Sequence, residues 1–450
     1  MAGSRWAMIR YAAVTRPPAE SAPTAYKLGS RRPIPSSPVG NGTGDQGYRG
    51  AGPRIAAVRI APSGELALAV AAGGPRWGED RDGGRAMSVG LRGRVAALCV
   101  AASVAIVVVA PGESATAGTS GQSSTEQLGI STFVPYNCES ATDWSLWASR
   151  QFRAFKKLGA NSVALAFPMY TYSLTSNSFF AKDVCGSPYQ TPPTSELTPL
   201  IDIAHADGLQ VFLRPLLYET NLATEGGWRG VIDPTDPSVW FVNYWHAMKP
   251  YLVMAQADHV EHFAIATELQ SMAPLSGWKS IIAQARRIYT GDLVFTTTWL
   301  PKENAGVHWP STSAGFDLYW GLQGLPDTAT ADQIVAGWDN ALATDNPFPL
   351  ISVATISEIG ILPQDGAYSQ PYQWTLPLNT NPFNQSIQAT WFTAACSFFK
   401  SHDMGGIYYW GSTIYDQNGA LLTKPSMGAA AIAEIQPLSQ KAIAECFTGK

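Results

Sequence analysis

Charged residues are scarce in this 450-residue chain, at 14% of the sequence, and several motifs of enzyme chemistry are missing. Its six His are scattered, with no H-x-H or H-E-x-x-H pattern, and no Cys/His spacing resembles a zinc site. Residues 118–450 also lack a G-x-S-x-G elbow, a Walker loop and a dinucleotide-binding glycine pattern. These absences argue against a zinc enzyme, a serine hydrolase and a nucleotide-dependent enzyme, and we expect no metal or organic cofactor.

The charges that are present divide the chain into two parts. Residues 1–117 hold 14 Lys and Arg against 7 Asp and Glu, a net charge of +7. Residues 118–450 hold 16 Lys and Arg against 27 Asp and Glu, a net charge of −11. An acidic main part argues against nucleic acid or an anionic membrane surface as a partner.

The basic amino-terminal part has no globular pattern. Residues 1–86 are rich in Arg, Gly, Pro and Ala without a clear period, which predicts an unstructured upstream extension. From Met87, two arginines lead into the apolar run 95–110, and Ala115-Thr116-Ala117 follows, which is typical of a signal peptide over residues 87–117. The alternative, a membrane anchor, would need about 20 apolar residues, whereas this run has 16. We therefore expect a secreted mature protein that begins at residue 118 and has no stable membrane association.

Four cysteines remain in the expected mature chain. In an oxidising compartment an even number favours two disulfides out of three possible pairings, with buried free thiols as the alternative. We predict Cys138 with Cys185, and Cys396 with Cys446 at the carboxyl-terminal end.

Apolar strand patterns and helix patterns alternate along residues 118–450, and 46% of the whole chain is hydrophobic, enough for one large core. The predicted strands span residues 130–134, 162–167, 210–213, 263–267, 293–298, 316–320, 350–356 and 406–410. The predicted helices span residues 144–158, 195–206, 238–257, 277–289, 331–343 and 384–401. Eight strands that alternate with helices predict an α/β fold, a single (β/α)8 TIM barrel over residues 118–450.

Two of the predicted strands each carry a glutamate near their carboxyl end. Glu268 follows the apolar run 263–266, and Glu358 lies near the end of the run 349–359. Because catalytic residues of such barrels lie at the carboxyl ends of the strands, we expect both carboxyl groups at one edge. A pair of carboxyl groups there is typical of glycoside hydrolysis. The alternative for each is a structural carboxylate that pairs with an Arg or caps a helix.

Four segments then give a specific resemblance. They are G-G-W-R-G-V-I at 226–232, A-T-E-L at 266–269, R-R-I-Y-T-G at 286–291 and S-E-I-G at 357–360. With most of residues 128–415, they resemble glycoside hydrolase family 113, the retaining clan A barrels whose named members are β-mannanases. The resemblance implies that Glu268 is the general acid/base and Glu358 the nucleophile.

The same resemblance supplies further site residues. It implies that the Tyr319 hydroxyl binds the nucleophile and that Trp410 forms a platform under the sugar. We also predict substrate contacts for Trp299, Trp228, Arg229 and Arg214. The alternative for Trp299 and Trp410 is barrel packing, and for Trp228 and Arg229 it is a solvated loop with a single stacked cation. For Arg214 the alternative is an acid partner.

The predicted function is a secreted retaining endo-glycosidase on a β-1,4-mannan-type polysaccharide or oligosaccharide, acting as a monomer. Arg214 stands where the family more often has Lys before Pro, and Thr298 stands where it tends to place Asn before Trp. These departures leave open a clan A hydrolase on another β-glycan, and a non-catalytic glycan-binding barrel is a further alternative.

Overall fold

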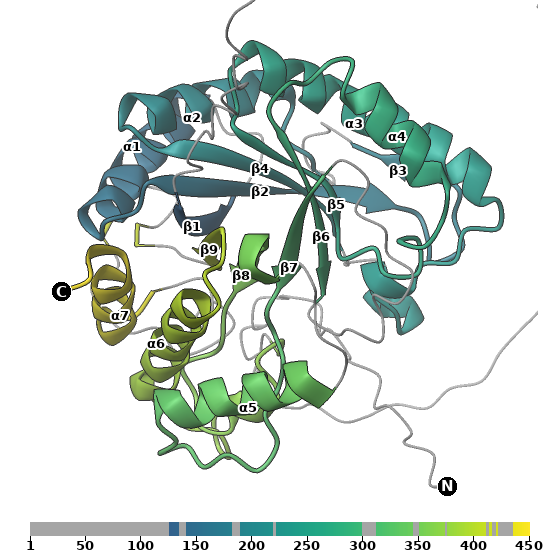
Figure 1. Cartoon of the computed structure of the whole chain (residues 1–450). Helices are drawn as coiled ribbons and strands as arrows, with labels where there is room; N and C mark the ends of the chain where they lie inside the picture. Colours follow the sequence, from purple (N-terminus) through teal and green to yellow (C-terminus); the bar gives the residue numbers. More distant parts are fainter. Residues whose placement is uncertain are drawn as a thin grey trace, which may run out of the picture. The chain divides into compact units, whose positions relative to one another are not determined.

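A computed structural model (Figure 1) describes residues 126–134, 141–181, 190–218, 222–298, 312–344, 351–373, 376–410, 414–415, 420–421 and 435–450. All of these residues belong to the same compact unit. The predicted extension 1–86, the predicted signal peptide 87–117 and the predicted Cys138–Cys185 pair lie outside them, as does Trp299.

Within the described residues, eight parallel strands close into a barrel. Its order is β1-β9-β8-β7-β6-β5-β4-β2, and parallel pairing of β2 with β1 closes it. The strands are β1 (Gln127–Phe133), β2 (Ser162–Thr171), β4 (Gln210–Leu217), β5 (His262–Thr267), β6 (Asp292–Thr298), β7 (Ser313–Asp317), β8 (Thr355–Ile359) and β9 (Gly406–Tyr409). A two-residue strand, β3 (Phe179–Phe180), pairs antiparallel with the end of β2. The predicted (β/α)8 barrel is confirmed.

Helices surround the strands, as Figure 1 shows. They are α1 (Ala141–Lys157), α2 (Thr194–Ala206), α3 (Pro237–Ala257), α4 (Gly277–Ala285), α5 (Ala331–Thr344), α6 (Gln385–Ser401) and α7 (Pro437–Thr448). All six predicted helices are present, whereas α7 was not predicted. Among the described residues, no helix combines the length and the apolar character needed to span a membrane.

The strand predicted at residues 350–356 is displaced toward the carboxyl end. Residues Ile351–Val353 form a 3₁₀ turn instead, and Val353 is 63% exposed. Strand β8 begins only at Thr355, where the chain becomes buried beside β7 and β9. As a result Glu358 lies inside the strand rather than beyond it.

Strand β4 shows how the barrel places polar groups in its interior. Side chains alternate between the two faces of a strand. Phe212 packs in an apolar layer inside the barrel, and Leu216 packs in a second one with Trp410. Leu213 belongs to the core between the strands and the helices. Arg214, midway between Phe212 and Leu216, therefore points into the barrel, where its side chain is fully buried.

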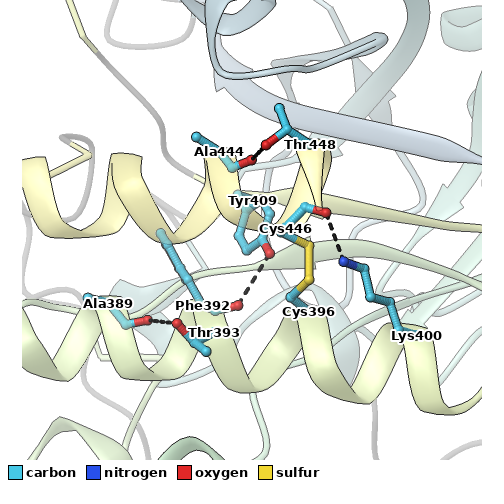
Figure 2. The surroundings of a disulfide bond; sticks show 9 residues. All are labelled: Ala389, Phe392, Thr393, Cys396, Lys400, Tyr409, Ala444, Cys446 and Thr448. Atoms are coloured by element: carbon cyan, nitrogen blue, oxygen red, sulfur yellow. Dashed lines mark hydrogen bonds between the residues drawn. A yellow bond between two sulfur atoms is a disulfide. The ribbon is translucent and has the colours of Figure 1, made fainter. Parts of the chain in front are cut away.

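A disulfide fastens the last helix to the barrel. Cys396 of α6 is bonded to Cys446 of α7, as predicted, across 50 residues of chain (Figure 2). Both cysteines are buried, and Lys400 Nζ donates a hydrogen bond to the Cys446 carbonyl oxygen at 2.9 Å. The bond and the contact hold α7 along α6.

Loss of this disulfide is expected to lower the free energy of unfolding by roughly 2–4 kcal/mol, because the bond restricts the unfolded chain over a loop of this length. The measurement is urea denaturation of the double variant Cys396→Ser/Cys446→Ser beside wild type, with Ser401→Ala as a control in the same helix. A midpoint equal to that of wild type would show that the bond does not stabilise the barrel.

Candidate active site

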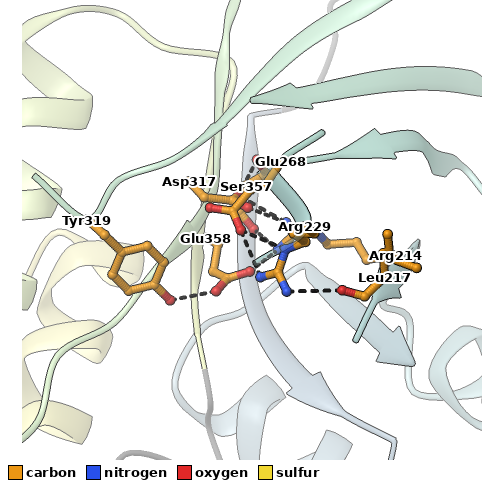
Figure 3. A network of polar contacts seen from close by, with 8 residues as sticks. All are labelled: Arg214, Leu217, Arg229, Glu268, Asp317, Tyr319, Ser357 and Glu358. Atoms are coloured by element: carbon orange, nitrogen blue, oxygen red, sulfur yellow. Dashed lines mark hydrogen bonds and ion pairs between the residues drawn. The ribbon is translucent and has the colours of Figure 1, made fainter. Parts of the chain in front are cut away.

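Glu358 is held at both of its carboxylate oxygens (Figure 3). Tyr319, two residues beyond the end of β7, donates its hydroxyl to Glu358 Oε1 at 2.6 Å. Arg214 Nη1, from β4, donates to Glu358 Oε2 at 3.0 Å. The Glu358 side chain is 3% exposed. The contact between Tyr319 and Glu358 is the one that the family resemblance implied.

Arg214 connects Glu358 to a second acid. Its Nη2 donates to both oxygens of Asp317, at 2.9 Å each, and its Nη1 also donates to the Ser357 carbonyl oxygen at 2.7 Å. Of the two interpretations that the sequence left open, a sugar contact or an acid partner, the structure has Arg214 paired with acids and fully buried.

Glu268 is the first residue after β5 and has a backbone φ of 51°, in the left-handed region that non-glycine residues rarely adopt. Its amide donates to the Thr296 carbonyl oxygen of β6 at 3.0 Å, which fixes the turn at the carboxyl edge of the barrel. Backbone strain of this kind persists where the surrounding contacts impose it, and it is common at functional sites.

Arg229 forms an ion pair with Glu268. Its Nη2 lies 2.7 Å and its Nε 2.9 Å from Glu268 Oε2, and the two side chains are 12% and 8% exposed. The 3₁₀ turn Arg229–Val231 is tied to the segment after Glu268, because the Ser271 amide donates to the Gly230 carbonyl oxygen at 3.1 Å. The structure therefore places Arg229, predicted as a substrate contact, directly on the candidate acid/base.

Two of the predicted substrate contacts, Trp228 and Trp410, differ in burial. The Trp228 ring is half-buried and covers Gly230, where no room is left for a side chain. Trp410 is 8% exposed and packs with Ala166 and Leu216. Its ring centroid is 6.0 Å from the Arg214 guanidinium carbon. Their predicted roles in substrate binding stay predictions, as does that of Trp299.

The protonation of the site follows from its burial. Burial raises the pKa of Glu358 above its ordinary value; the Glu268 charge adds to this rise, while Arg214 and the Tyr319 hydroxyl oppose it. Burial also raises the pKa of Tyr319 well above its ordinary value, so the phenol stays protonated and remains a donor. Burial raises the pKa of Asp317 well above its ordinary value too, against the attraction of Arg214.

The ionisable groups form one cluster of two guanidinium groups and three carboxyl groups. With every group ionised, its formal charge is −1. Because burial disfavours charge, the pKa values of Asp317 and Glu358 in this cluster are raised despite the neighbouring guanidinium group of Arg214.

Sequence reasoning missed Asp317 and Gln270. Asp317 lies inside the predicted apolar strand 316–320. A charged residue in such a strand indicates a buried polar contact, and this signal could have identified it. The side-chain NH2 group of Gln270 donates to the Glu268 carbonyl oxygen, and its side-chain oxygen accepts from the Thr298 backbone N–H at 2.8 Å. Gln270 had no comparable signal, because its role depends on the turn at Glu268. Among the described residues there is no group of three or more His, Cys, Asp or Glu side chains that could hold a metal ion.

A closed barrel with two buried glutamates at the carboxyl edge is the arrangement of a barrel glycoside hydrolase. Residues 136–423 match the sequence profile of Glycoside Hydrolase Family 113. Because this match covers more than half of the 450 residues, the chain belongs to that family. The protein is therefore a glycoside hydrolase that acts on O-glycosyl bonds.

Solved structures agree with this fold. A GH113 β-1,4-mannanase in a complex structure is 18% identical, over 72% of this chain and 99% of that chain, with a TM-score of 0.54. The GH113 β-mannanase AaManA from Alicyclobacillus acidocaldarius, in complex with ManMIm, is 19% identical, over 72% of this chain and 97% of that chain, with a TM-score of 0.53. A comparison with curated protein sequences gives no significant match.

Proposed function

We propose that this chain is a secreted retaining endo-glycosidase that hydrolyses a β-1,4-mannan-type polysaccharide by double displacement. The observation that carries the proposal is the pair of buried glutamates at one barrel edge, each with different partners. Family membership supports glycoside hydrolysis, and the β-mannanase structures above favour mannan as the substrate. Secretion rests on the signal-peptide pattern of residues 87–117.

In the first step, a Glu358 oxygen attacks the anomeric carbon while the glycosidic bond breaks, and Glu268 gives its proton to the leaving oxygen. In the second step, Glu268 takes a proton from water, the water oxygen bonds to the anomeric carbon, and the Glu358 carboxylate is released. Arg214 and Tyr319 suit Glu358 for this role, since both stabilise its ionised form by donating to its oxygens.

Glu268 needs a different environment in each step. Its ion pair with Arg229 suits the second step, in which it acts as a carboxylate base. In the first step it must carry a proton, so the pair has to open when the sugar enters. Arg229 can leave more easily than Arg214, because it lies on a short turn and is partly exposed. Trp228, Trp299, Trp410 and Arg229 are the proposed sugar contacts.

The proposed function is tested by reducing-sugar release from β-mannan, glucomannan, cellulose, xylan and cell-envelope glycans. Release mainly from mannan is the expected result. Release from another polymer alone would leave the proposed mechanism standing and would show that mannan is not the substrate. The departures from the family pattern at Arg214 and Thr298 would agree with that result. Binding to one glycan with no release from any would favour a glycan-binding barrel instead.

A further inference from the structure

Asp317, the last residue of β7, is an acid that the double displacement does not use. Its side chain is completely buried. Three donated contacts converge on it: Arg214 Nη2 reaches both of its oxygens at 2.9 Å, and the Ser357 hydroxyl reaches Oδ1 at 2.9 Å. Figure 3 draws it in the same network of polar contacts as Arg214, Ser357 and Glu358. Hydrogen bonds thus link the Asp317 side chain to Arg214, which contacts Glu358, and to Ser357, which precedes Glu358 in β8.

The guanidinium group of Arg214 couples the orientation of Glu358 to the position of Asp317, because it contacts both side chains. It is planar and rigid, so fixing Nη2 against Asp317 also fixes the direction of Nη1. Nη1 is the atom that donates to Glu358 Oε2 at 3.0 Å. Strands β7 and β8 are neighbours in the barrel, and Asp317 is in register with Glu358. The side chains of Arg214, Asp317 and Glu358 therefore form one network that joins strands β4, β7 and β8.

Asp317 also balances the charge of Arg214. Burial alone would lower the pKa of Arg214, but Asp317 and Glu358 together raise it above its ordinary value. If Glu358 were the only acid in contact with Arg214, the positive charge of Arg214 would be balanced by the nucleophile alone. With Asp317 present, Arg214 is anchored on one side and contacts Glu358 through a single nitrogen. The nucleophile is then oriented without being fully neutralised.

We propose that Asp317 is a positioning residue, which anchors Arg214 so that Arg214 and Tyr319 together aim Glu358 at the anomeric carbon. This inference rests on the proposed role of Glu358 as nucleophile. It assigns to Asp317 an effect on the rate of the first covalent step rather than on substrate affinity. Asparagine is a poor replacement for Asp317, because its one acceptor oxygen can take at most two of the three donated contacts and its NH2 group cannot accept the third.

The test is labelling of Glu358 by 2,4-dinitrophenyl 2-deoxy-2-fluoro-β-mannoside, followed by intact mass and peptide mass spectrometry. In this reaction a Glu358 oxygen bonds to the anomeric carbon and dinitrophenolate leaves without needing a proton. In Asp317→Asn the limiting labelling rate is expected to fall roughly 100-fold, the effect of a small misplacement of a reacting group. The probe concentration at half-maximal rate should stay within about twofold. Misfolded molecules would appear as an unlabelled fraction and would not slow the labelling of the others.

Two further variants complete the design. Asp292→Asn makes the same change at the other end of the barrel, where Asp292 contacts His262 and Ser313, and its labelling rate should equal that of wild type. Ser357→Ala removes one donor to Asp317 and should slow labelling by about twofold to tenfold, the contribution of one hydrogen bond. If Asp317→Asn does not fold, the labelling rate of Ser357→Ala tests the inference in its place.

The outcomes separate the two claims. Wild type that is unlabelled, or labelled at another residue, would overturn the proposed function. Wild type labelled at Glu358, with Asp317→Asn or Ser357→Ala labelled equally fast, would overturn the role of Asp317 alone. Slower labelling in these variants at unchanged probe affinity, with Asp292→Asn unaffected, supports the inference.

Discussion

Replacing Glu358 with Ala is expected to lower kcat on mannan by roughly five to six orders of magnitude, the loss seen when a covalent nucleophile is removed. Without its carboxylate no bond can form to the anomeric carbon. The hydroxyl of Tyr319 also loses its acceptor, and Nη1 of Arg214 loses one of its two acceptors. The measurement is reducing-sugar release at saturating substrate. Circular dichroism of the variant should show the helix content of wild type.

The matched control for this variant is Glu445→Ala, on α7. Glu445 is a half-exposed carboxylate that pairs with Lys441 at 3.2 Å, and its loss should leave kcat unchanged. If Glu358→Ala released sugar at a rate within tenfold of wild type, Glu358 would not be the nucleophile.

Glu268→Ala is expected to lower kcat on polysaccharide by about 10²–10⁴-fold, the usual contribution of general acid–base catalysis. The loss should depend on the leaving group. A sugar alkoxide needs the proton of Glu268, whereas dinitrophenolate does not, so the first step on a dinitrophenyl glycoside should stay close to the wild-type rate. The measurement is the burst of dinitrophenolate in a stopped-flow experiment.

A small anion should restore the second step in this variant. The substitution removes the Glu268 carboxylate that pairs with Arg229 and opens space for azide, which attacks the anomeric carbon without a base. The product should be a glycosyl azide of the same anomeric configuration as the substrate. An equal loss on both leaving groups, with no effect of azide, would contradict an acid/base role for Glu268.

The barrel could be predicted from sequence because strands buried on both faces appear as uninterrupted apolar runs. Each of the eight predicted runs overlaps a barrel strand, and both glutamates were found from their place at strand ends. The error at 350–356 arose because apolar composition cannot show where a chain enters the barrel. The last helix was missed because three of its five buried residues, Ser439, Ala442 and Cys446, are small, which weakens the apolar pattern.

The polar network could be predicted only in part. Sequence placed Arg214 and Arg229 near the site, but which acid each one contacts depends on how strands far apart in the chain face one another. Arg214 and Asp317 are 103 residues apart, and no local pattern joins them. The same holds for the left-handed turn at Glu268, which arises from tertiary contacts rather than from a glycine.

The most direct test of the central claim is the configuration of the first product. Mannohexaose would be hydrolysed in an NMR tube and the anomeric protons followed before mutarotation. Double displacement through Glu358 predicts that the β-anomer appears first and that the α-anomer grows in later. If the α-anomer appeared first, water would attack directly, and Glu358 would be a general base rather than a nucleophile.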